Sequence, residues 1–243
     1  MLSIVKSMAL YGLEGYVVNV QVDVSSGMPN WEIVGLPDTS IKEAKERVRT
    51  AIKNSGFELQ SRKIVVNLAP ADTRKMGSSF DLPIAVGVLT SLEKVKQQNL
   101  SDTIFIGELS LDGKINPVSG ILPMCIEAKK LGIKRAIIPE ENLPETSVLK
   151  EIQILGVNHL KQVVQYLNGK EKLQTKTTSW EEVASQTQGN MLDFSEVKGQ
   201  ENVKRALEIA AAGGHNAMLI RKSWFWQNHA SQKASHYFTR FDF

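Results

Sequence analysis

The amino-acid sequence predicts an α/β (α+β) fold for residues 1–168, and three observations support this. Short segments rich in β-branched residues alternate apolar and polar positions, which is typical of strands buried on one face. Longer segments place apolar residues three or four positions apart, as helices with one buried face do. Glycine or proline stands at the ends of most of these segments, where turns are expected.

In the first half of this region the pattern predicts three strands and two helices. The first helix, residues 40–54, begins with Ser40 and Glu43 spaced as a capping box, and Gly56 follows it as a C-terminal cap. The second helix covers residues 82–92 and tolerates Pro83 in its first turn. The strands are expected at residues 17–24, 31–34 and 63–68.

The second half continues the alternation of strands and helices. A strand at 104–109 leads to a turn at Asp112-Gly113, and Gly132 ends the next helix. The remaining predicted elements are helices at 122–131 and 159–167 and strands at 135–139 and 153–157.

After residue 168 the composition changes. Residues 169–190 are polar and rich in Lys, Gln, Thr and Ser, which predicts a linker. A helix is expected at 201–212, ended by two glycines, and the apolar run 217–220 is short enough for a buried parallel strand. We therefore expect a second module to begin at residue 191.

Composition excludes several classes of protein. In 243 residues no apolar run approaches the ~18 needed for a membrane helix, and the N-terminus lacks the basic and apolar regions of a secretory signal. Cys125 is the single cysteine, so an intramolecular disulfide is excluded. These features predict a cytoplasmic protein without a membrane partner.

Two stretches are specific enough to indicate a family. The first, residues 69–85, reads APADTRKMGSSFDLPIA; the second combines FSEVKGQ at 194–200 with AAGGHN at 211–216. Together, in this order, they resemble the ComM/YifB family, which are magnesium-chelatase-like AAA+ ATPases of bacteria. The segments YGLEG at 11–15 and VGLPD at 34–38 fit the same family, so the resemblance covers residues 1 to about 220.

This resemblance implies both architecture and activity. Residues 1–168 would have the fold of the Lon proteolytic domain, and residues 191–220 would begin a magnesium-chelatase-like AAA+ ATPase domain. Intact members resemble hexameric, ATP- and magnesium-dependent motors that move DNA branches in natural transformation. DNA and further copies of the chain are the implied partners, and Val197, Gly199 and Gln200 would lie around the adenine.

A Lon-type peptidase needs a serine nucleophile and a lysine base. By motif, Ser79 stands at the position of the nucleophile, but Leu122 stands at the position of the lysine, and leucine cannot accept a proton. We therefore expect no catalytic residues and no proteolysis. Ser79 is interpreted as a helix N-cap ahead of Asp81 or as a packed small residue.

The other reactive residue types give weaker signals. Asp72, Arg74 and Lys75 form a charged stretch that we interpret as a solvated loop, with phosphate or a neighbouring subunit as the alternative contact. Cys125 is expected in the core, and His159 has no other metal-ligating residue at ligand spacing. His215 follows two glycines and is either near nucleotide or part of a turn.

The phosphate-binding loop of an AAA+ module should follow residue 220, but residues 221–228 contain no glycine. The tail 221–243 also carries a net charge of +3, the whole net charge of the chain. Tryptophan has a single codon, so a one-base shift turns Trp224 and Trp226 into glycines, and the shifted codons admit GSPGSGKT, a complete phosphate loop. We therefore expect a truncated, frameshifted family member that binds neither ATP nor magnesium.

Two other functions fit parts of the sequence. Trp224, Phe225 and Trp226 beside Arg221 and Lys222 could stack and neutralise a single-stranded nucleic acid without any enzymatic activity. A Lon-like serine peptidase at Ser79 is the other alternative, and Leu122 argues against it.

Overall fold

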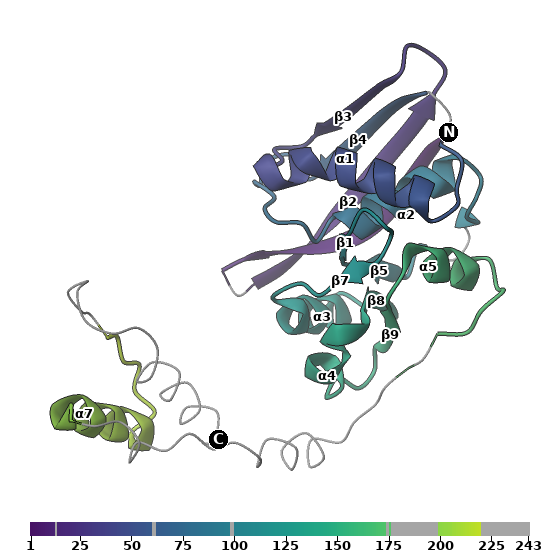
Figure 1. Ribbon diagram of the computed structural model, residues 1–243. Helices are drawn as coiled ribbons and strands as arrows, with labels where there is room; N and C mark the ends of the chain where they lie inside the picture. Colours follow the sequence, from purple (N-terminus) through teal and green to yellow (C-terminus); the bar gives the residue numbers. More distant parts are fainter. Residues whose placement is uncertain (13, 60–61, 98–99, 174, 176–198, 220–243) are drawn as a thin grey trace. The chain divides into compact units, whose positions relative to one another are not determined.

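The computed structural model forms two compact units, Met1–Trp180 and Glu181–Phe243, which are treated separately below (Figure 1). The described residues are 1–12, 14–59, 62–97, 100–173, 175 and 199–219.

Within the described residues, the first unit is built on a seven-stranded sheet with the strand order β3-β4-β2-β1-β5-β8-β9. β1 pairs antiparallel with β2, and β2 pairs antiparallel with β4, whereas the other four pairings are parallel. The predicted α/β class is therefore confirmed. The strands are β1 (Leu2–Tyr11), β2 (Glu14–Ser25), β3 (Asn30–Val34), β4 (Lys63–Ala69), β5 (Thr103–Phe105), β8 (Arg135–Pro139) and β9 (Gln153–Val157).

Helices cover both faces of this sheet (Figure 1). One face is covered by α1 (Thr39–Asn54), α2 (Asp81–Ser91) and α5 (Leu160–Leu167). The other is covered by α3 (Ile121–Lys130) and the short α4 (Leu143–Thr146), which follows the 3-10 turn η2 (Glu140–Asn142). A separate two-stranded hairpin of β6 (Glu108–Leu109) and β7 (Ile115–Asn116) turns at Asp112-Gly113, as the sequence predicts.

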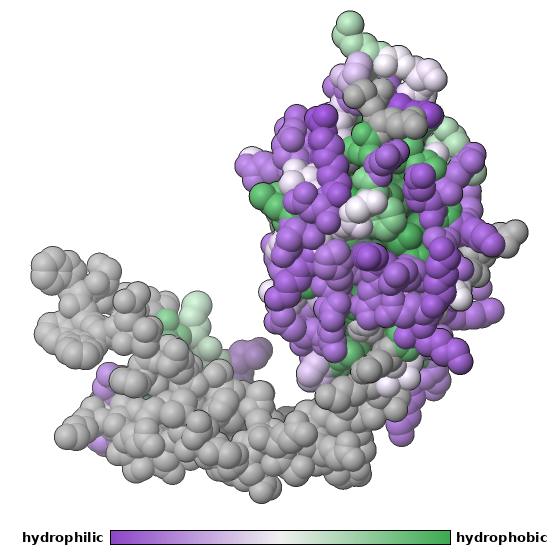
Figure 2. Space-filling view, turned by 45° about the vertical axis from the view of Figure 1, so that its right-hand side comes forward, coloured by the Kyte–Doolittle hydropathy of each residue, from purple (hydrophilic) through white to green (hydrophobic). Residues whose placement is uncertain are grey.

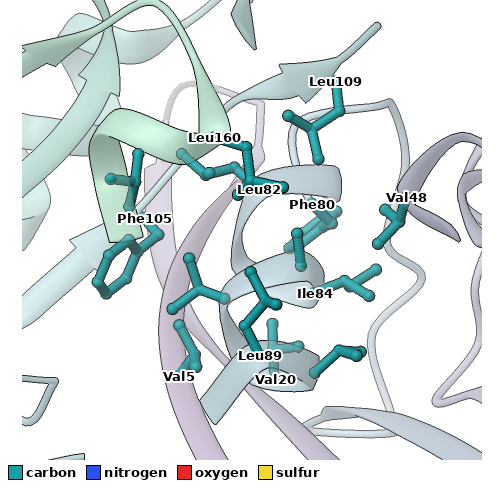
Figure 3. Close-up of a cluster of buried hydrophobic side chains, with 14 of the residues drawn as sticks. Val5, Val20, Val48, Phe80, Leu82, Ile84, Leu89, Phe105, Leu109 and Leu160 are labelled. Carbon is teal, nitrogen blue, oxygen red and sulfur yellow. The ribbon is translucent and has the colours of Figure 1, made fainter. Parts of the chain in front are cut away.

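The two buried clusters follow the alternation of side chains along each strand. In β5, Phe105 joins the larger cluster under α2, while Ile104 joins the cluster under α3. Figure 3 shows the larger cluster, with Leu82, Ile84 and Leu89 of α2 near Val5 and Phe105 of the sheet. Strands buried on both faces explain the continuous apolar runs in the second half of the domain.

The start of α1 differs from the predicted capping box. The side chain of Asp38 caps the helix by accepting a hydrogen bond from Ile41 N at 2.9 Å. Ser40 lies inside the helix, where its carbonyl accepts a hydrogen bond from Arg47. Gly56 follows the helix with φ +85°, the left-handed conformation that glycine adopts without strain.

The second unit is described only for residues 199–219. Its helix α7 (Glu201–Ala212) has the predicted bounds and buries Leu207, Ala210 and Ala211. The strand predicted at 217–220 is not formed over its described residues 217–219. In the first unit, Leu173 of the predicted linker packs against the larger cluster, and the domain boundary at 168 stays a prediction.

Hydrophilic residues (purple) predominate over the part of the surface seen in Figure 2, and hydrophobic residues (green) are visible between them. Among the described residues, no helix combines the length and the apolar character needed to cross a membrane.

Candidate functional site

A pocket of about 430 Å³ lies at the end of β1, beside the segment that leads into α2. Its wall combines three serine hydroxyls, one carboxylate and one guanidinium with apolar side chains from β1 and α3. The lining residues are Ala9, Leu10, Arg74, Met76, Gly77, Ser78, Ser79, Glu108, Pro117, Val118, Ser119 and Met124. The candidate nucleophile Ser79 is therefore in this pocket.

Backbone hydrogen bonds fix the turn that carries Ser79. The Ser79 carbonyl accepts a hydrogen bond from Gly107 N at 3.0 Å, and Leu82 N donates to the Gly107 carbonyl at 3.0 Å. Helix α2 begins at Asp81 with Phe80 in the N-cap position, and no side chain caps it. The interpretation of Ser79 as an N-cap is therefore wrong. Ser79 is a packed small residue with 9% of its surface exposed.

Glu108 is the carboxylate in the pocket wall, and neutral groups hold it. The Ser78 hydroxyl donates to Glu108 Oε2, and Asn116 Nδ2 donates to Glu108 Oε1 at 3.3 Å. Glu108 is half-buried, so one side of it is open to the pocket. No motif in the sequence pointed to Glu108 or Asn116, because the β6–β7 hairpin brings them together only in the fold.

Asp81, the first residue of α2, is a fully buried carboxylate with a charged partner. Arg47 of α1 donates two hydrogen bonds to its carboxylate oxygens, at 2.8 and 3.0 Å, and Leu109 N donates a third at 3.2 Å. Burial raises the pKa of Asp81 to about 6, although the hydrogen bonds from Arg47 act in the opposite direction. The pair links α1, α2 and β6 behind the serine turn.

The charged loop before this turn is not wholly solvated, as had been expected. Asp72 and Arg74 are exposed, but Lys75 is completely buried. Lys75 Nζ donates to the Thr73 carbonyl at 2.6 Å, and its backbone N–H donates to the Leu36 carbonyl at 3.2 Å. Burial lowers the pKa of the Lys75 ammonium. Lys75 does not line the pocket, so its role there is to hold the loop in place.

The position of the Lon-type lysine is occupied by Leu122, which is half-buried in the first turn of α3 and does not line the pocket. Gly120 directly before the helix has φ +80°. Among the described residues, no lysine or histidine donates to or accepts from the Ser79 hydroxyl. A serine without a neighbouring base is a weak nucleophile, so this pocket lacks the chemistry of a serine peptidase.

The predicted nucleotide-binding residues are only partly described. Val197 lies outside the described residues, and Gly199 and Gln200 are exposed ahead of α7 with φ +69° and +60°. The residues that should form the phosphate loop, 221–228, also lie outside them, and their lack of glycine does not fit a bound triphosphate. We therefore derive no step that uses ATP.

The remaining reactive side chains have structural partners. Cys125 is buried in the core, where burial raises its pKa to about 12. His159 caps α5, because its Nδ1 accepts a hydrogen bond from Lys161 N at 3.0 Å. His215 N donates to the Ala210 carbonyl beyond the end of α7. Over the residues that the structure describes, no group of three or more side chains could hold a metal ion.

Comparison with known proteins gives matches over most of the chain. Residues 20–142 match the family described as subunit ChlI of Mg-chelatase, and residues 193–223 match magnesium chelatase, subunit ChlI. The chain is 40% identical to competence protein ComM of Haemophilus influenzae over 220 residues, which are 90% of the chain and 43% of that protein. It is 41% identical to YifB of Escherichia coli over 220 residues, which are 90% of the chain and 42% of YifB.

A more distant similarity links the chain to a protease. It is 28% identical to Lon protease 2 of Bacillus subtilis over 181 residues, which are 66% of the chain and 32% of the protease. The chain spans about two fifths of the length of the ComM and YifB relatives.

Proposed function

We propose that this chain, which belongs to the ComM/YifB family of magnesium-chelatase-like proteins, provides the Lon-like N-terminal domain of an ATP-driven protein that acts on DNA. We propose further that the domain does not hydrolyse peptide bonds. The observation that carries this proposal is the pocket around Ser79, which keeps a serine in a fixed turn but has leucine at the position of the lysine base.

The role in DNA processing rests on relatives. One of them is named a competence protein, and competence is the uptake of DNA. In the intact protein, ATP, magnesium and a hexameric ring would belong to the AAA+ module. The residues described here contribute the domain that precedes that module.

A hydrolysis assay tests the absence of peptidase activity. Fluorescein-labelled β-casein is incubated with the full chain, with Ser79→Ala and, as the active reference, with Lon protease 2 of Bacillus subtilis. We expect fragments only with the reference protease, because Ser79 has no base to activate it. Casein hydrolysis by the chain that disappears in Ser79→Ala would refute this part of the proposal.

A graft tests the role in DNA processing. Residues 1–180, the first compact unit, replace the matching segment of Haemophilus influenzae ComM, and transformation with chromosomal DNA is measured. We expect the graft to restore transformation relative to an in-frame deletion of the segment, and Ser79→Ala in the graft to have no effect. A graft that is made and stable but no better than the deletion contradicts the proposal.

A further inference from the structure

One edge of β1 has no strand beside it over its last residues. β1 pairs with β2 from Leu2 to Tyr11, but it pairs with β5 only at Lys6, opposite Ile104. After β5 the chain turns away, and Gly107 N donates to the Ser79 carbonyl instead of continuing along β1. Among the described residues, no strand therefore covers the outer edge of β1 beyond this point.

The register shows which backbone groups this edge presents. The β1–β2 hairpin closes at the pair Tyr11–Glu14 across two residues, so these two residues exchange hydrogen bonds with each other. Backbone groups alternate along a strand, so Met8 and Leu10 direct theirs away from β2, as Lys6 does toward β5. Leu10 is thus a backbone donor and acceptor at the pocket, whose wall it helps to form.

The opposite wall of the pocket is polar at its base. Ser78 and Ser79 lie in the fixed turn before α2, Glu108 accepts the hydrogen bond of Ser78, and Ser119 is exposed before α3. Apolar side chains, among them Met76, Val118 and Met124, complete the wall. An unpaired strand edge beside a half-apolar pocket is the arrangement that accepts an added β-strand, whose alternate side chains enter the pocket.

We propose that the edge of β1 at Met8–Leu10 and the adjoining pocket bind an extended segment of another polypeptide and do not cut it. The absence of cutting rests on the proposed function above. A polypeptide backbone supplies donors and acceptors at the spacing of the edge. The pocket holds one cation, Arg74, and one anion, Glu108, so it offers no net positive charge to the phosphates of a nucleic acid.

A binding assay with a matched pair of variants tests this proposal. Fluorescein-labelled β-casein, an unstructured polypeptide, is titrated with the full chain and followed by fluorescence anisotropy. Ser119→Trp fills the pocket from an exposed position, and Ser101→Trp makes the same change at an exposed turn residue outside it. We expect saturable binding that Ser119→Trp weakens at least about tenfold and Ser101→Trp leaves unchanged.

Hydrogen exchange locates the binding on the chain. With β-casein bound, amides of the segment 6–12 should exchange more slowly, because an added strand protects Leu10 N–H, while the exposed face of α1 should not change. Absent binding, equal affinity of the two tryptophan variants, or protection elsewhere overturns the inference. Casein fragments in the same samples would refute the proposed lack of peptidase activity and leave the binding site intact, so the two failures are distinguishable.

Discussion

Two carboxylates beside the serine turn have opposite environments. Asp81 is fully buried and held by the guanidinium of Arg47, whereas Glu108 is half-buried, faces the pocket and is held by the neutral groups of Ser78 and Asn116. A buried charge depends strongly on its partner, but a carboxylate near solvent does not. The comparison teaches that the buried pair is structural, while the pocket side is free to vary chemically.

Removing the cation of the buried pair should give the largest effect. Arg47→Leu leaves Asp81 buried beside a single backbone donor, Leu109 N, and breaking a buried pair in this way costs about 3–5 kcal/mol. We expect urea unfolding of Arg47→Leu to show a loss of stability of this size.

Arg49→Leu is the matched control, because Arg49 lies exposed on the same helix. Its expected change is within about 0.5 kcal/mol. Similar losses in the two variants would remove the distinction between the buried carboxylate and the exposed surface.

The pH dependence of stability should identify Asp81 next. Its pKa in the folded chain is raised to about 6 from the ordinary value of 3.8, so the folded state binds this proton more tightly than the unfolded state. The group therefore contributes most to stability below pH ~4, and this contribution is lost as the pH rises through ~6. The two values differ by about 2 units, or about 3 kcal/mol.

Asp81→Asn isolates this effect. The variant leaves Arg47 unpaired, but that cost is the same at every pH in this range because arginine stays charged. The stability of the wild-type chain minus that of Asp81→Asn should therefore fall by up to about 3 kcal/mol between pH 4 and 7. A difference that stays flat, or that rises with pH, would show that Arg47 outweighs the burial of Asp81.

Much of the fold could be predicted because each element carries a local signal. The α1 region shows a helical apolar period and the second half shows continuous apolar runs, and both patterns survive in the structure. β1 was missed, since Leu2–Tyr11 mixes Ser3, Ser7 and Lys6 with apolar residues. Its two serines are buried and satisfied by distant carbonyls, those of Gly87 and Phe105, which no local pattern reveals.

The candidate site was only partly predictable for the same reason. Ser79 and Leu122 followed from short motifs, but Glu108 and Asn116 meet across a hairpin, and Lys75 is buried although its neighbours Asp72 and Arg74 are exposed. Burial of a lysine in a charged loop depends on the strands that close over it, here through Leu36 and Asp38. Sequence alone therefore identifies the residues at the turn better than their environment.

The smallest effect is expected at the pocket carboxylate. Glu108→Gln keeps an oxygen to accept the hydrogen bond of Ser78 and disturbs only the weaker contact with Asn116, so the loss of stability should be about 1 kcal/mol or less by urea unfolding. The variant should also keep its affinity for β-casein, because the neutral amide still donates and accepts at the pocket wall. If Glu108→Gln costs as much as Arg47→Leu, both carboxylates are structural, and the pocket side is as constrained as the core behind it.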